Sequence, residues 1–268
     1  MSKIFELFGY PLEDTSEEAL KIRKNAQCPF MGVDCDGGGN RHLSNINLTQ
    51  NPKLAEFFEG RTVVPSGVCS LQLRANESPW MICPRRIFVF RKGDSGLRTN
   101  QRFSERLVLA HSSYASKTKV GVWSELRVAY RKDRKSFQYT FDYVLMPLMS
   151  LDQHEIEGVT GKSWSQIRHA VESSGYSMTR RKGIDFVDDF PSGSPLIVEV
   201  MTSSTSGGNK TKRTTIPMAF EDAVLGKPHQ GPGINYRQVW ARMVSQLVVK
   251  SEVGLAWGGK TIVTKEYV

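Results

Sequence analysis

The 268-residue sequence contains no apolar run long enough to cross a membrane, so we expect a soluble protein. No secretory signal opens it, because Met1 to Phe5 leads directly into an acidic segment. We therefore expect a cytoplasmic protein, in a reducing compartment where disulfides are rare. Internal repeats and long low-complexity tracts are also absent. The length fits one large domain or one domain with an appended lobe.

Cysteine is scarce, and all four cysteines fall in the first third of the chain, at Cys28, Cys35, Cys69 and Cys83. Cys28 and Cys83 each precede a proline, Cys69 follows a glycine turn, and several glycines follow Cys35. Tight turns present sulfur well to a tetrahedral zinc or iron ion, which takes four thiolates. The gaps of 6, 33 and 13 residues lack the two-residue knuckle of zinc ribbons and fingers. Spacing therefore leaves two interpretations open, one metal site or four reduced, buried thiols.

The net charge of +9 comes from 36 Lys and Arg against 27 Asp and Glu, with a pI near 9.4. Such a surplus favours a polyanionic partner, above all nucleic acid, over an unengaged basic surface. Lys and Arg residues form five short basic clusters. Each cluster alone is typical of a solvated turn, but the recurrence of five supports binding to a polyanion. The clusters are 85–86, 91–92, 131–135, 180–182 and 210–213.

Periodicity predicts an α/β protein. Apolar spacing favours a helix over 3–25, and 28–100 alternates turns with strand-like pieces at 68–73 and 87–90. Alternating residues at 122–130 and 137–145, joined by a charged turn, predict a β-hairpin. After a helix bearing Trp164 comes a buried strand at 195–201. The stretch 202–212 looks flexible, and the chain ends in a helix at 236–250 and a strand at 255–263.

Two carboxylates are the candidates for chemistry, Asp142 in the hairpin and Glu199 in the buried strand. A lone acid in a strand is costly unless it is paired or binds a metal. Carboxylates at adjacent strands can hold Mg²⁺, which bridges to a substrate phosphate. The alternative for Asp142 is that its side chain faces solvent on the exposed side of the hairpin. Exposure to solvent is a poorer explanation for Glu199, because its neighbours in the sequence are apolar.

The chain resembles the NotI-type type II restriction endonucleases over nearly its whole length. The matching stretches, which come in the same order, are 5–9, 28–30, 67–69, 80–84, 125–145, 199–202 and the helix bearing Arg242, Gln246 and Lys250.

The resemblance implies a PD-(D/E)xK nuclease core with a central mixed sheet flanked by helices, at 101–268. It also implies a metal-stapled DNA-recognition lobe at 1–100, with iron, alternatively zinc, on the four cysteines. Asp142 and Glu199 become the Mg²⁺-binding acids, and Glu125 is a third candidate. A GC-rich palindrome is the implied target.

The sequence departs from the family pattern at two places. Met201 stands where the superfamily has a lysine, and methionine cannot polarise a phosphate. Gln246 or Lys250, which share one helix face, are the first substitutes, and Lys210 or Lys212 are the second; the alternative is an ordinary polar helix face. The long insertion before Glu199 also carries Asp185, Asp188 and Asp189, one of which could replace Asp142.

We therefore expect a restriction enzyme that hydrolyses double-stranded DNA at a specific sequence with Mg²⁺. Cutting both strands of a palindrome calls for a homodimer. The alternative is a metal-stapled DNA-binding protein derived from a nuclease and without catalytic activity, in which Met201 marks the loss. An RNA-binding zinc module has little support, because the sequence shows no aromatic RNP-type strand.

Overall fold

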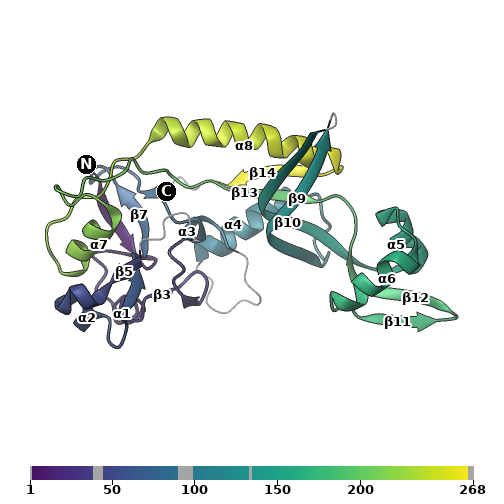
Figure 1. Cartoon of the computed structure of the whole chain (residues 1–268), viewed down its shortest axis with the longest axis horizontal. Coiled ribbons are helices and arrows are strands. Elements are labelled where there is room, and N and C mark those ends of the chain that lie inside the picture. The colour runs from purple at the N-terminus through teal and green to yellow at the C-terminus, as the bar shows by residue number, and fades with distance from the viewer. Residues whose placement is uncertain (1, 39–44, 90–98, 133–134, 265–268) are drawn as a thin grey trace. The chain divides into compact units, whose positions relative to one another are not determined.

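The structure is a computed structural model that describes residues 2–38, 45–89, 99–132 and 135–264 (Figure 1). It is mixed α/β and groups the chain into two compact units. Unit 1 comprises 1–107, 200–245 and 263–268, and unit 2 comprises 108–199 and 246–262. The predicted lobe at 1–100 lies within unit 1, and the predicted core at 101–268 contributes to both units.

Unit 1 is built on a four-stranded sheet of order β2-β1-β7-β8. Its strands are β1 (Lys3–Leu7), β2 (Tyr10–Pro11), β7 (Val68–Gln72) and β8 (Trp80–Met81). Two small two-stranded sheets accompany it, β3 (Gln27–Cys28) with β4 (Val33–Asp34) and β5 (Asn45–Asn47) with β6 (Val63–Pro65). The helices are α1 (Glu17–Lys24), the 3-10 turn η1 (Leu48–Gln50), α2 (Pro52–Phe57), α3 (Pro84–Ile87) and α7 (Ile216–Val224).

The single helix predicted over 3–25 is wrong in its first half. The left-handed backbone of Phe8 and Gly9, at φ 48° and 78°, turns the chain between β1 and β2, so a helix cannot continue there. The helix that forms in the second half, α1, is capped by Ser16, whose side chain accepts a hydrogen bond from the Ala19 amide. The predicted strand at 68–73 is confirmed as β7. The strand predicted at 87–90 is wrong over its described residues, because Ile87 ends helix α3, which has Pro84 in its first turn, and residues 88–89 are not in a strand.

Aromatic rings fill the core of unit 1. Phe8 is buried and meets Phe58 and Phe220 at centroid distances of 6.2 and 6.1 Å, in edge-to-face packing. Close by in the sheet, the buried Glu6 carboxylate is bound by the Arg86 guanidinium at 3.1 Å and by the Ser70 hydroxyl at 2.8 Å. A buried ion pair of this kind needs such extra hydrogen bonds to offset its lost hydration.

Gly67→Ala is expected to destabilise unit 1 by about 2–4 kcal/mol. Gly67 has φ +57°, and an added Cβ would lie 2.3 Å from the Phe8 ring. Gly60→Ala is the matched control, because Gly60 has φ +75° with nothing within 4 Å, and it should cost only about 1–2 kcal/mol. Urea unfolding of both variants measures the difference. Equal losses would contradict the packing of Phe8 on Gly67.

Unit 2 is built on a sheet of order β11-β12-β10-β13-β14, with β9 paired to β10. Its strands are β9 (Val120–Lys132), β10 (Lys135–Asp152), β11 (Met178–Arg181), β12 (Ile184–Pro191), β13 (Leu196–Val200) and β14 (Lys260–Thr264). Its helices are α5 (Gln153–Thr160) and α6 (Trp164–Ser173). Four elements have residues in both units: α4 (Thr99–Ala110), β13, α8 (Tyr236–Ala256) and β14.

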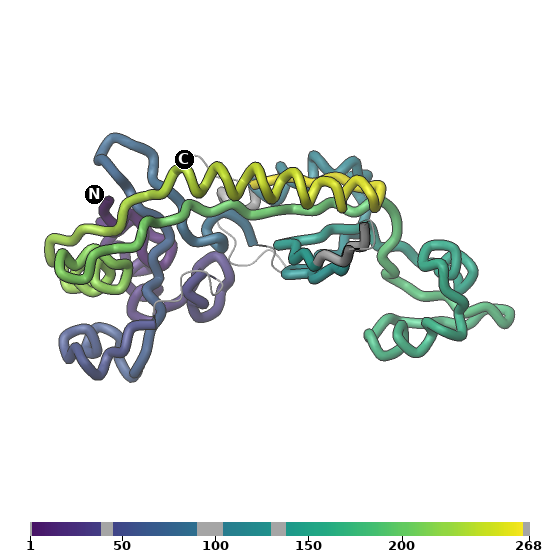
Figure 2. The backbone as a smooth tube through the Cα atoms, turned by 45° about the horizontal axis from the view of Figure 1, so that its top comes forward, coloured from purple at the N-terminus to yellow at the C-terminus, as the bar shows by residue number. Residues whose placement is uncertain are grey.

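Most sequence predictions for this half are confirmed. The hairpin is β9 with β10, the buried strand is β13, the Trp164 helix is α6 and the last helix is α8. The last strand begins later than predicted, at Lys260, because α8 runs on to Ala256. Figure 2 shows the chain leaving β10, forming α5, α6, β11 and β12, and returning as β13. Arg91, Lys92 and Arg134 lie outside the described residues.

Candidate functional site

Asp142 and Glu199 lie directly opposite each other on two neighbouring antiparallel strands. The register pairs Tyr143 of β10 with Val198 of β13, which sets Asp142 across from Glu199. The Asp142 amide donates a hydrogen bond to Glu199 Oε1 at 3.3 Å. Residues at opposite positions of adjacent strands have Cβ atoms about 5 Å apart and share one face. The two predicted acids are therefore brought together as the sequence indicated.

Lys250 completes this site from helix α8. Its ammonium contacts Glu199 Oε2, in a pair where both side chains are buried, and also lies 5.7 Å above the centroid of the Phe141 ring. Burial raises the pKa of Glu199 to about 7; the neighbouring Asp142 charge adds to this shift and the Lys250 ammonium opposes it. Glu199 thus exchanges a proton near neutral pH, and a divalent cation would favour its carboxylate form.

Glu125, the third candidate acid, lies on β9 at the position facing Asp142. The register pairs Phe141 with Leu126 and Tyr143 with Ser124, which leaves Glu125 between them. Its φ of 52° is left-handed, which is strained for a residue with a side chain, and the residue is exposed. Strained backbone of this kind occurs often at functional sites, where the surrounding structure holds it in place.

The structure distinguishes among the proposed substitutes for the missing lysine. Met201 is buried, and its amide donates to the Thr264 carbonyl at 3.0 Å, so its role is in packing and pairing. Lys250 makes the contact with Glu199. Gln246, one turn earlier on α8, has a buried Oε1 without a hydrogen-bond partner among the described residues. Lys210 and Lys212 are exposed in a turn of unit 1.

The acids of the insertion make other contacts. Asp185 is buried and accepts a hydrogen bond from Trp164 Nε1 at 3.0 Å. Asp188 accepts from the Ser150 hydroxyl at 2.7 Å, and Asp189 pairs with Lys119 at 2.5 Å. These partners account for the acids as structural groups, which favours Asp142 as the strand acid.

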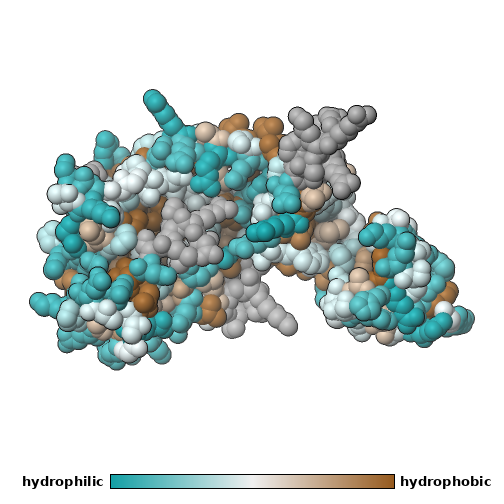
Figure 3. Space-filling view, in the orientation of Figure 1, coloured by the Kyte–Doolittle hydropathy of each residue, from teal (hydrophilic) through white to brown (hydrophobic). Residues whose placement is uncertain are grey.

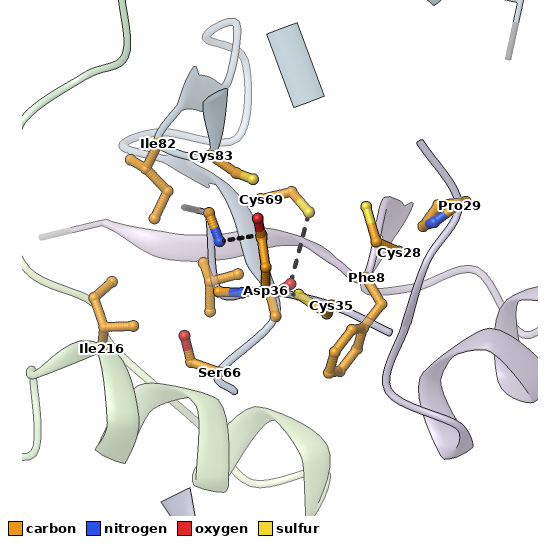
Figure 4. A pocket seen from close by; sticks show the side chains of 14 residues that line it. Phe8, Cys28, Pro29, Cys35, Asp36, Ser66, Cys69, Ile82, Cys83 and Ile216 are labelled. Atoms are coloured by element: carbon orange, nitrogen blue, oxygen red, sulfur yellow. Dashed lines mark hydrogen bonds between the residues drawn. The ribbon is translucent and has the colours of Figure 1, made fainter. Parts of the chain in front are cut away.

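The four cysteines line one small pocket of unit 1 (Figure 4). Its volume is about 20 Å³, which is room for a single ion or water molecule. Cys28, Cys69 and Cys83 are buried, Cys35 is partly buried, and all four are free cysteines. Cys28 lies in β3 and Cys69 in β7, and Cys35 and Cys83 lie just after β4 and β8. The fold thus brings together residues far apart in the sequence.

Backbone amides surround these sulfurs. The amides of Gly9 and Gly37 donate to Cys69 and Cys35 at 3.3 and 3.4 Å. The Cys28 sulfur receives backbone hydrogen bonds from Phe30 and Met31, and the Cys83 sulfur receives them from Arg85 and Arg86. Amides directed at sulfur stabilise a thiolate, the form that binds a metal.

In the absence of a cation, the pKa values of three of the four thiols are raised, and that of the fourth is lowered. Burial raises the pKa of Cys28 to about 11 and that of Cys35 to about 12. The hydrogen bond between Cys69 and Cys83, followed by burial, raises the pKa of Cys69, and the same bond lowers the pKa of Cys83. Throughout the part of the chain that the structure describes, no three His, Cys, Asp or Glu side chains have the arrangement of a metal centre. The predicted four-thiolate site therefore stays a prediction, which the shared pocket and the amides favour.

Purified protein is expected to contain about one equivalent of iron plus zinc per chain. A metal on four thiolates would replace part of the core of unit 1, so Cys69→Ser should lower the folding yield more than cleavage per folded molecule. Elemental analysis measures the metal, and iron would add a reddish colour. Less than about half an equivalent, with unchanged folding of Cys69→Ser, would contradict the site.

No model of a known protein family matches the chain, and no curated protein matches it by sequence. Among the helices in the described ranges, none combines the length and apolar character needed to span a membrane.

Proposed function

We propose that the protein is a sequence-specific double-strand DNA endonuclease of the NotI type that requires Mg²⁺. One observation carries this proposal: Asp142, Glu199 and Lys250, which come from two strands and a helix, meet at one place in unit 2. Two carboxylates that can hold a divalent cation, beside an ammonium group that can neutralise phosphate charge, are able to support phosphodiester hydrolysis. The sequence resemblance and the net charge of +9 support the same conclusion.

In this proposal Asp142 and Glu199 hold Mg²⁺, and Glu125, on the strand position facing Asp142, is the candidate for a third carboxylate. Bound there, the ion would supply Lewis acidity toward the scissile phosphate and would make a water molecule easier to deprotonate. Lys250 orients the attacking water or neutralises charge on the phosphoryl oxygens. A water oxygen bonds to phosphorus and releases a proton to the surrounding solvent as the bond from phosphorus to O3′ breaks, and O3′ takes up a proton. The products are 5′-phosphate and 3′-hydroxyl ends.

The basic clusters hold the DNA backbone, and cleavage of both strands uses two copies of the chain. Two-fold symmetry of the protein would then match a palindromic target. Light scattering of the protein on a duplex containing its site is expected to give a dimer. Double-strand cleavage by a strict monomer would contradict this arrangement.

The alternative is a metal-stapled DNA-binding protein without catalysis, which Met201 favours. The contact of Lys250 with Glu199 favours the endonuclease, because a cation is present where Met201 supplies none. Incubation with plasmid DNA and Mg²⁺, with Glu199→Gln as the matched control, separates the two. Discrete fragments from the wild-type protein alone support the endonuclease, and DNA binding without fragments supports the alternative.

A further inference from the structure

Residues 148–191 of unit 2 form a small lobe around a core of their own. Leu151, Ile156, Val171, Val187 and Phe190 are buried together, and four partly buried residues pack against them, namely Trp164, Ile167, Tyr176 and Met178. The lobe consists of the end of β10, helices α5 and α6, and the hairpin β11–β12. It lies between the two candidate acids in the sequence, and the proposed chemistry does not use it.

Helices α5 and α6 are joined by a short turn. Gly161 ends α5 in the left-handed conformation at φ 65°, Lys162 follows, and Ser163 caps α6. Capping boxes fix both helix starts, Asp152 with Glu155 and Ser163 with Gln166. Two packed helices joined by three residues that include a glycine have the pattern of a DNA-binding helix-turn-helix.

The exposed side of α6 carries polar side chains, and its two charged residues, Arg168 and Glu172, form an ion pair at 2.9 Å. Trp164, Ile167 and Val171 turn toward the core of the lobe, whereas Ser165 and His169 are exposed on the opposite face. Hydroxyl and imidazole groups on a helix of this size fit the major groove and can hydrogen-bond to base edges there.

The hairpin β11–β12 ends in a group of exposed cations. Its register pairs Arg181 with Ile184, and the two turn residues, Lys182 and Gly183, both have positive φ at 50° and 82°. This is the tight turn that keeps a hairpin in register. Arg180, Arg181 and Lys182 are all exposed, and Figure 3 shows hydrophilic side chains over the tip of this lobe.

Asp185 holds the hairpin beside α6. Its carboxylate accepts from Trp164 Nε1 at 3.0 Å and lies 3.9 Å from Arg168 of α6 and 3.7 Å from Arg180 of β11. The helix face and the cationic tip are therefore fixed relative to each other. A wing held beside a recognition helix can contact the phosphates that flank the groove the helix enters.

The other acids of the lobe are engaged in contacts of their own. Asp152 and Glu155 form the capping box, Glu157 accepts from the Trp164 amide at 2.6 Å, and Glu172 pairs with Arg168 at 2.9 Å. Asp188 and Asp189 bind Ser150 and Lys119, as described above. Arg180 contacts Asp185, whereas none of the ion pairs among the described residues involves Arg181 or Lys182. The tip of the hairpin thus presents the positive charge of these two residues, which a phosphate backbone attracts.

We propose that residues 148–191 are a winged helix-turn-helix that binds duplex DNA, with α6 in the major groove and the β11–β12 tip on the adjacent phosphates. The lobe then contributes to recognition of the sequence that the carboxylate site cuts. This part of the proposal rests on the proposed function, whereas binding of the lobe to duplex DNA does not.

The test compares the full-length double variant Arg181→Ala/Lys182→Ala with a control that removes two exposed lysines of unit 1, Lys21→Ala/Lys24→Ala. Fluorescence anisotropy of a labelled mixed-sequence duplex of about three turns, in EDTA, gives affinity over a salt series. Loss of two phosphate contacts should lower the slope of log K against log salt by about 1.8 and weaken binding at least about tenfold at low salt. The control should match the wild-type protein, and thermal unfolding checks that each variant is folded.

A second variant, His169→Ala, should change the preference among duplexes that differ at single base pairs without changing the salt slope. Wild-type binding and slope in the tip variant, with unchanged preference in His169→Ala, would overturn the proposal even if the enzyme cleaves DNA. If the tip variant loses binding but the wild-type protein never cleaves, the lobe proposal is supported and the proposed endonuclease is contradicted.

Discussion

Glu199→Gln should lower the rate of DNA cleavage by about a thousandfold or more while DNA binding in EDTA stays within about twofold of wild type. The amide keeps the size of the side chain but cannot hold Mg²⁺ as a carboxylate does. Asp142→Asn should behave in the same way, because Asp142 faces Glu199 across the strand pair. Single-turnover cleavage and anisotropy measure the two properties separately.

Glu59→Gln is the matched control for both acid variants. Glu59 is exposed and pairs only with the exposed Lys24 in the described contacts, so its replacement should leave cleavage unchanged. Full cleavage by Asp142→Asn, with Glu199→Gln inactive, would move the assignment to another acid, and Glu125 would be tested next. Full cleavage by both acid variants would show that the chemistry lies elsewhere.

Lys250→Met should reduce cleavage by roughly a hundredfold or more, the effect of losing one transition-state contact. Met201→Leu should leave most of the rate, because a buried methionine and leucine have similar volumes and neither can bind a phosphate. Gln246→Ala tests the other residue on the same helix face, and we expect a smaller effect, since Lys250 is the residue that contacts Glu199. Single-turnover cleavage of each variant is compared at equal folded fraction.

Lys260→Met is the control for removing a lysine from unit 2. Lys260 is exposed, and its ammonium donates a hydrogen bond to the Ser113 hydroxyl at 2.7 Å. In the sequence it is far from both acids. The Lys260→Met variant should cleave DNA at the same rate as the wild-type protein. If Lys250→Met and Lys260→Met cleave equally fast, Lys250 has only a packing role beside Phe141 and Glu199.

The candidate active site could be predicted largely from the sequence because its acids lie on strands with strong local patterns. Alternating residues fixed the hairpin, and the apolar run around Glu199 marked a buried strand. The sequence left four candidates for the residue that replaces the missing lysine: Gln246, Lys250, Lys210 and Lys212. The choice depends on which of these side chains the fold brings to Glu199. Only the packed structure shows that Lys250 is the one that contacts Glu199.

Other features were missed for local reasons. The spacing of Ile4, Leu7 and Phe8 fits a helix, and the signal against it was Gly9 followed by Pro11. The left-handed backbone of Glu125 had no sequence signal, because no glycine marks it. The helix pair α5–α6 did have a sequence signal: Asp152 and Glu155, then Gly161, then Ser163 and Gln166 give two capping boxes around a turn.

The most direct test of the central claim is a digest of long DNA of known sequence with the purified protein and Mg²⁺, followed by sequencing of every new end. The account predicts discrete fragments whose ends all fall at one palindromic sequence, with 5′-phosphates, and no fragments in EDTA or with Glu199→Gln. Intact DNA under conditions where the protein binds duplex, or the same fragments from Glu199→Gln, would contradict it.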